Sequence, residues 1–420
     1  MEETTKQKFR LTGLERAWIL YDVGNSAFVL LVATLIPIFF NALAAEGGLS
    51  SVEYLAYWGY AASAVTVITA ILSPILGTLA DTRNFKKPIF ILCLVVGVAG
   101  CCAMGLAKTW LPFLLIFIFA KVGFSGSLVF YDSMLSDVTT PERMDEVSAR
   151  GYAWGYIGSC IPFVVCLALV LGAGSIGISQ LTALNIALFI TAAWWLVTTL
   201  PLLGQYRQLH YVELERHAIR QSFARIGHTI RHLHEDRQVF WFLLAFFCYI
   251  DGVYTIIDMA TAYGTALGLD TTGLLLALLL TQVVAFPSAL VFGRLSTNHP
   301  STQLIPACIA AYAGIALFAF FLTQQWQFWV LAVAVGMFQG GVQALSRSHF
   351  AKIIPPEKSG EYFGLFDICG KGASFLGTMI VSVGSQLTGS ANVGVGSLIV
   401  LFVIGFVLFR VSTRTGKITG

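Results

Sequence analysis

The sequence has very little charge. Only 11% of its 420 residues are Asp, Glu, Lys or Arg, whereas an ordinary soluble domain has roughly 25%. Hydrophobic residues make up 57% of the chain, and the mean hydropathy is +0.78. This composition excludes a soluble enzyme, a disordered scaffold and a secreted disulfide domain. The net charge of +3 is too small to indicate a nucleic-acid partner.

The sequence also lacks the common motifs of enzymes and cofactor sites. None of its eight cysteines forms a Cys-x-x-Cys pair, and all lie in apolar runs, which is typical of packing residues. Gly370-Lys371-Gly372 lacks the spacing of a phosphate loop, so nothing supports ATP-driven transport. Residues 1–16 carry no cleavable signal pattern. We therefore expect no enzymatic activity, no cofactor and no bound metal.

Long apolar runs fill most of the chain. Each is about 20 or more residues long, which suits a membrane helix, and none shows the short alternating pattern of a barrel strand. The polar stretch 204–238 separates six runs in residues 1–203 from six in 239–420, which predicts two six-helix bundles joined by a linker. The runs are 14–42, 54–80, 88–107, 111–137, 149–173, 180–203, 239–268, 272–297, 302–323, 327–350, 361–388 and 392–411.

The loops between these runs carry a strong charge asymmetry. Of the 25 Lys and Arg residues, 22 fall in the ends and loops on one side. Lys108 alone falls on the other side, and Lys121 and Lys371 lie inside runs. Because cytoplasmic loops are enriched in Lys and Arg, we expect both termini in the cytoplasm.

The two halves of the chain resemble each other. Pro141-Glu142-Arg143 is matched 215 residues later by Pro356-Glu357-Lys358, and Tyr21-Asp22 is echoed by Tyr249 and Asp251. Parallel repeats of six helices are typical of secondary transporters with a central binding site.

Several stretches also resemble a known family. The loop Gly77–Lys87 resembles the Gly-x-x-x-Asp-x-x-Gly-Arg-Lys motif of the major facilitator superfamily, with Asn84-Phe85 in place of Gly-Arg. Trp18–Phe28, Gly340–Ser348 and Phe363–Lys371 are similar to the vacuole-effluxer-like family, which is related to autophagy-associated vacuolar amino-acid exporters. The resemblance implies export or exchange of small solutes, with spans 1, 4, 7 and 10 lining a cavity.

Charged residues inside the spans are candidates for function, because a charge in the bilayer is costly. Polar residues at i, i+3, i+4 and i+7 share helix faces with these charges, and such faces are expected to point inward. The predicted substrate or coupling residues are Asp22, Asn25, Ser26, Lys121, Ser125, Asp251, Thr255, Gln339, Gln343, Asp367 and Lys371.

These residues predict a central site with charges of both signs. Lys121 and Lys371 would bind a carboxylate or phosphate, and Asp22 or Asp251 would bind an amino group, a proton or another cation. Alternatively, Asp367 and Lys371 neutralise each other at i, i+4, and Asp22 only braces Asn25.

Four further residues predict a gate at the cytoplasmic side. Asp132 and Arg347 are 215 residues apart and opposite in charge, which predicts a salt bridge between the halves. Alternatively, each binds its own loop. For Asp81 and Arg83, the superfamily resemblance implies a latch between spans 2 and 11, and positive-inside charge is the alternative.

Together these observations predict an all-α, twelve-helix protein with the major facilitator fold. It would move an amino acid, a similar zwitterion or an organic anion by alternating access with proton coupling. The alternatives are efflux of amphipathic drugs or lipids, and a receptor or assembly factor that transports nothing. Its expected partners are a small solute, protons or another ion, and the lipid bilayer. We expect a monomer in a bacterial plasma membrane.

Overall fold

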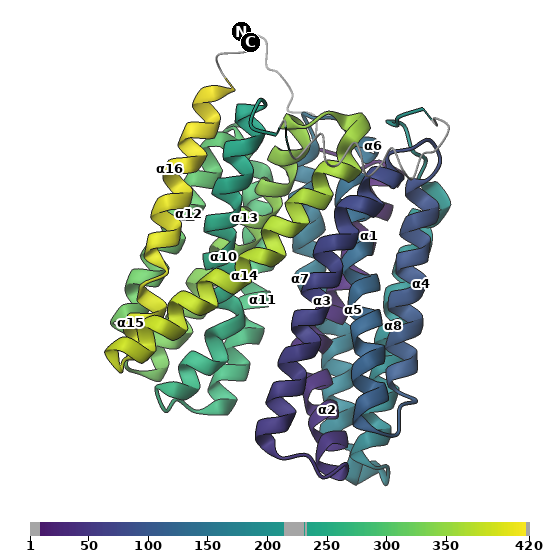
Figure 1. The fold of residues 1–420 in the computed structure, drawn as a ribbon, viewed down its shortest axis with the longest axis vertical. Helices are drawn as coiled ribbons and strands as arrows, with labels where there is room; N and C mark the ends of the chain where they lie inside the picture. Colours follow the sequence, from purple (N-terminus) through teal and green to yellow (C-terminus); the bar gives the residue numbers. More distant parts are fainter. Residues whose placement is uncertain (1–8, 214–230, 232, 417–420) are drawn as a thin grey trace.

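The computed structural model describes residues 9–213, 231 and 233–416. Among these residues the regular structure is helical apart from one isolated β-bridge. Two bundles stand side by side (Figure 1). The first comprises α1 (Gly13–Ala33), α2 (Leu35–Glu46), α3 (Ser51–Ala80), α4 (Lys86–Met104), α5 (Trp110–Ser133), α6 (Leu135–Val138), α7 (Met144–Leu171), η1 (Ala173–Ile176) and α8 (Gln180–Gln205).

The second bundle continues the chain after the linker. It comprises α10 (Arg237–Ala266), α11 (Thr271–Leu295), α12 (Ser301–Phe320), α13 (Gln325–Ile353), η2 (Pro356–Lys358), α14 (Ser359–Thr388), α15 (Ala391–Gly396) and α16 (Ile399–Thr415).

The helices are long enough to cross a bilayer. In the described part of the chain, eleven are sufficiently long and apolar, and α14 packs beside α3 and α10 as a twelfth. The predicted all-α, twelve-helix fold is therefore confirmed. We call the side where α1 begins and α16 ends the termini side, and the opposite side the far side; the termini side is at the top of Figure 1.

The first predicted span is broken into α1 and α2 at Thr34. Pro37 has no N–H, and its ring collides with the carbonyl of residue 33 in a regular helix. Thr34 Oγ1 instead donates to the Leu30 carbonyl at 2.6 Å. The uninterrupted apolar run concealed this break from the hydropathy pattern.

The two bundles repeat a hydrogen bond between spans 1 and 4 and between spans 7 and 10. Tyr21 and Ser127 lie 2.7 Å apart through their hydroxyls in the first bundle. Tyr249 and Ser346 lie 2.6 Å apart in the second. Two buried tyrosines thus join equivalent helices, as the sequence echo between Tyr21 and Tyr249 suggests.

The loop between α3 and α4 depends on a left-handed residue. Asn84 has φ +63°, a conformation that asparagine tolerates better than most residues other than glycine. This explains how the loop turns although Asn84 stands where the superfamily motif has glycine.

Candidate functional site

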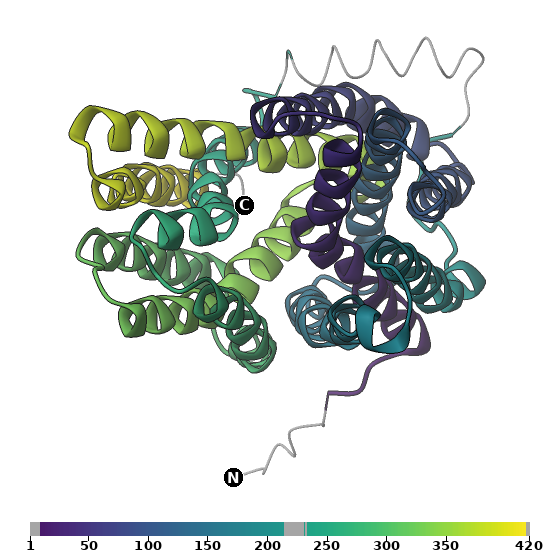
Figure 2. The same ribbon diagram turned by 90° about the horizontal axis from the view of Figure 1, so that it is seen from below.

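The bundles contact each other chiefly near the termini side. There α3 packs on α14, and α7 packs on α11 and α13. Viewed from the far side, these helices form the boundary between the purple-to-blue and green-to-yellow halves (Figure 2). Three groups of polar contacts join the bundles at this boundary.

Arg347 of α13 is the centre of the first group. Its side chain is only 2% exposed. Its Nη1 lies 3.0 Å from Asp132 Oδ1 and 3.7 Å from Asp22 Oδ2, both in the first bundle. Its Nε and Nη2 donate to the side chain and the carbonyl of Ser148, at 2.9 and 3.0 Å. Two carboxylates and a serine from one bundle therefore hold a buried cation from the other.

Aromatic rings surround this guanidinium. Its carbon lies 4.4 Å from the ring centre of Tyr152, 4.6 Å from Trp18 and 5.3 Å from Tyr131. Tyr131 also donates a 3.1 Å hydrogen bond to Asp22 Oδ2. Because cation–π attraction strengthens when water is excluded, the rings add to the ion pairs and keep water away from them.

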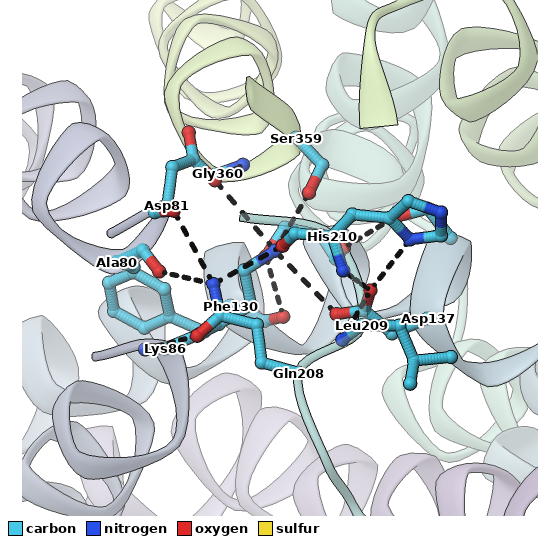
Figure 3. A network of polar contacts seen from close by, with 12 residues as sticks. Ala80, Asp81, Lys86, Phe130, Asp137, Gln208, Leu209, His210, Ser359 and Gly360 are labelled. Carbon is cyan, nitrogen blue, oxygen red and sulfur yellow. Dashed lines mark hydrogen bonds and ion pairs between the residues drawn. The ribbon is translucent and has the colours of Figure 1, made fainter. Parts of the chain in front are cut away.

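The second group joins the α3–α4 loop to the start of α14 (Figure 3). Asp81 accepts hydrogen bonds from the backbone N–H groups of Gly360 and Glu361, at 2.7 and 2.8 Å. A carboxylate at a helix N-terminus is favoured by the helix dipole. Lys86, fully buried, donates to Ser359 Oγ at 2.8 Å and lies 3.7 Å from Asp81. Both residues thus hold the first turn of α14.

Burial sets the electrostatics of Asp81. Removal from water raises the pKa of its carboxyl to about 7, while the Lys86 charge and the two N–H donors act in the opposite direction. Burial thus favours the protonated form of Asp81, whereas Lys86 and the two N–H donors favour its ionised form.

Arg83 lies apart from the contacts between Asp81 and α14. It does not hold α14 but lies 3.5 Å from Glu213 and over the ring of Tyr211, both in the linker. Both partners of this pair are largely exposed. The superfamily resemblance implied one latch that contains both Arg83 and Asp81, because the two residues are neighbours in the loop motif.

The third group joins α7 to the end of α13. Asp145 accepts a 2.6 Å hydrogen bond from Ser348 and lies 2.6 Å from Lys352 Nζ. Ser148 donates to the Ala344 carbonyl at 2.8 Å while it accepts from Arg347. We did not predict Asp145, Ser148 or Lys352 from the sequence, because a polar residue near a helix end is common and carries no distinct signal.

Further polar residues lie deeper between the bundles. Ser73 of α3 donates to Asp367 Oδ2 of α14 at 2.9 Å. Lys121 Nζ lies 4.8 Å from the ring centre of Phe124, and its charge acts on Asp258 of α10 in the other bundle. Asp258 is exposed. The side chain of Lys371 lies outside the described part of the chain.

Lys121 and Asp132 are on the same helix, 11 residues apart, which is about 16 Å at the rise of an α-helix. Lys121 therefore lies closer to the far side of the molecule than the Arg347 contacts do. Asp258 shares the polar face of Asp251 and Thr255 in the sequence, but our predicted set did not include it.

The sequence predicts Asp251 in a central site between the bundles. In the structure it lies inside the second bundle. Its Oδ1 accepts from the Gly377 N–H at 2.9 Å and from Thr255 at 3.3 Å. Its Oδ2 is buried and has no hydrogen-bond partner among the described residues. Helical spacing identified the face, but only the approach of α14 at Gly377 determines which neighbour that face meets.

The remaining predicted residues lie on helices at or near the boundary. Asn25, Ser125 and Gln339 are buried, and Ser26 and Gln343 are half-buried.

Comparison with known proteins identifies the family. The family model described as "Vacuole effluxer Atg22 like" matches residues 14–419. The chain belongs to this Atg22-like family. It is 43% identical over 404 residues to the uncharacterized MFS-type transporter YxiO of Bacillus subtilis, covering 95% of this chain and 94% of YxiO.

Fungal relatives of the Atg22-like chain are more distant. Autophagy-related protein 22 of Coccidioides immitis is 26% identical over 326 residues, and the match spans 51% of its length. Solved structures with the same fold include the major facilitator transporter FucP in the outward conformation, with a TM-score of 0.73, 15% identity and coverage of 95% of this chain and 97% of FucP. The human organic anion transporter MFSD10 has a TM-score of 0.71, 15% identity and coverage of 94% and 98%. The Atg22-like chain is thus a multi-pass membrane protein of the MFS transporter type.

Proposed function

We propose that this transporter is a secondary active carrier for an amino acid or a similar small zwitterion or organic anion. It would work by alternating access, with the termini side in the cytoplasm of a bacterial plasma membrane, and with proton coupling. The observation that carries the proposal is the buried Arg347 cluster. Arg347 belongs to one bundle and its two carboxylate partners belong to the other. Their contact can therefore form and break as the bundles rock.

The Arg347, Asp81 and Asp145 contacts, all of which join the two bundles, would together form the closed state of a cytoplasmic gate. Lys121 and Asp258 lie beyond it, on different bundles and with opposite charges. A zwitterion can pair its carboxylate with Lys121 and its ammonium group with Asp258. Because such a solute binds both bundles, it would stabilise their closure around it.

A ligand screen tests this proposal. We expect detergent-purified protein to be stabilised by a member of a panel of amino acids, dipeptides, sugar phosphates, carboxylates and amphipathic cations. A ligand at about 100 times its dissociation constant adds about 2.7 kcal/mol to the free energy of unfolding, which is visible as a thermal shift.

Lys121→Ala should abolish the shift given by a zwitterion or organic anion, because it removes the partner of the carboxylate. Lys108→Ala, which changes an exposed lysine on the far side, should keep the shift and serves as the control. A panel in which only lipids or amphipaths stabilise the protein would contradict the proposal and favour amphipath efflux.

Asp251→Asn tests proton coupling. The unpartnered Oδ2 of Asp251 can accept a proton without breaking a hydrogen bond, whereas an asparagine amide cannot. We expect the variant to lose accumulation driven by a pH gradient and to retain exchange of the solute across liposomes. Unchanged proton-driven uptake would remove Asp251 from the coupling role.

A further inference from the structure

The segment that follows α8 lies directly against the gate. We call residues 206–213, the described start of the linker, the linker strap. Val212 pairs with the α3–α4 loop in a short parallel bridge: its N–H donates to the Asp81 carbonyl at 2.8 Å, and its carbonyl accepts from the Arg83 N–H at 3.1 Å. The strap is thus attached to the same loop that carries Asp81.

Gln208 connects the two ends of that loop. Its Nε2 donates to the carbonyl of Ala80, the last residue of α3, at 3.0 Å. Its Oε1 accepts from the N–H of Lys86, the first residue of α4, at 3.4 Å. One side chain therefore bridges the end of α3 and the start of α4. Asp81 and Lys86, which contact α14, lie at these two ends.

Asp137 anchors the strap through several hydrogen bonds (Figure 3). Its buried carboxylate accepts from the Tyr206 hydroxyl at 2.6 Å and from the backbone N–H groups of Leu209 and His210, at 3.2 and 3.0 Å. His210 Nδ1 is 2.9 Å from the same carboxylate, and Lys86 Nζ is 3.9 Å away. Asp137 thus faces the strap on one side and the lysine of the gate on the other.

We propose that the linker strap is a working part of the gate and that Gln208 is a positioning residue. By bridging Ala80 and Lys86, Gln208 holds the α3–α4 loop so that Asp81 points at the free N–H groups of α14. The inference rests on the proposed alternating-access function, because it concerns the balance between the closed and open gate. It assigns to the beginning of the linker a conformational role beyond joining the bundles.

Gln208→Ala tests the inference through a distance between the bundles. Nitroxide labels would be placed on cysteines at the exposed positions Glu142 and Asn298, one in each bundle at the termini side. The half-buried Cys102, Cys248 and Cys369 would be replaced by serine. Pulsed electron-spin resonance then gives the distance distribution. Because the two hydrogen bonds that bridge Ala80 and Lys86 are lost, we expect the ratio of open to closed molecules to rise about tenfold.

Leu209→Ala is the matched control, because that neighbouring side chain is 62% exposed. It should leave the distribution unchanged. A Gln208→Ala protein with a lower melting temperature but the original distance distribution would overturn the inference, since a merely structural role predicts that result.

Arg347→Ala in the same label background separates this inference from the proposed function. If Arg347→Ala opens the gate and Gln208→Ala does not, the strap inference alone fails. If neither variant changes the distribution, the alternating-access gate itself is contradicted, and the strap inference falls with it.

Discussion

Arg347→Ala is expected to shift the transporter from the closed to the open gate by a hundredfold or more. The substitution leaves the carboxylates of Asp22 and Asp132 facing each other without their cation. Removing one partner of a buried ion pair costs about 3–5 kcal/mol, and every 1.4 kcal/mol is a factor of ten in the equilibrium. Opening the gate lets water reach both carboxylates, so the cost falls on the closed state.

The label pair at positions 142 and 298 measures this shift directly. Arg150→Ala is a suitable control, because Arg150 pairs with Glu146 of its own helix, α7. That variant also loses one arginine near the gate, but among the described residues it breaks no bond between the bundles. An Arg347→Ala protein that keeps the wild-type distance distribution would show that the cluster does not hold the gate closed.

Gly77→Val should have a comparably large effect through sterics alone. A side chain at Gly77 would place its Cβ 2.2 Å from the Gly360 carbonyl oxygen, and one at Gly360 would place its Cβ 2.5 Å from the Gly77 oxygen. The backbones of α3 and α14 therefore touch at this point. Because backbone cannot rotate away as a side chain can, valine must force the helices apart and prevent Asp81 from reaching α14.

Gly59→Val provides a matched control in the same helix. A Cβ at Gly59 meets nothing within 4 Å. We expect Gly77→Val to hold the gate open and to slow transport at least tenfold, and Gly59→Val to transport normally in proteoliposomes. Equal transport by the two variants would mean that α3 and α14 need not come together in the cycle.

The fold was predictable because hydropathy alone marks membrane helices. Twelve apolar runs and a polar linker specify the two bundles, and charge complementarity across an offset of 215 pointed to Asp132 and Arg347. The break at Thr34 was not predicted, because a proline within an apolar run does not reveal whether the helix bends or ends.

The candidate site was less predictable, because helical spacing shows which residues share a face but not what that face meets. Asp251 and Asp258 lie on one polar face of α10. Asp251 nevertheless accepts a hydrogen bond from α14, whereas Asp258 interacts electrostatically with Lys121 of the other bundle. The linker strap gave no sequence signal at all. Its contacts come from backbone groups, Gln208 and isolated side chains such as Tyr206 and His210, which no periodicity identifies.

The spacing of the Arg347 pair has a consequence for the origin of the two halves. Arg347 and Asp132 are separated by 215 residues, which is the offset that relates the two repeats. The two residues therefore occupy equivalent positions in the two halves. In a self-complementary dimer of identical halves, a residue on the two-fold axis meets its own copy. Two arginines or two aspartates would repel each other there. An ancestor with identical halves could not have closed by this ion pair, so the present gate required the two copies to diverge in sign at this position.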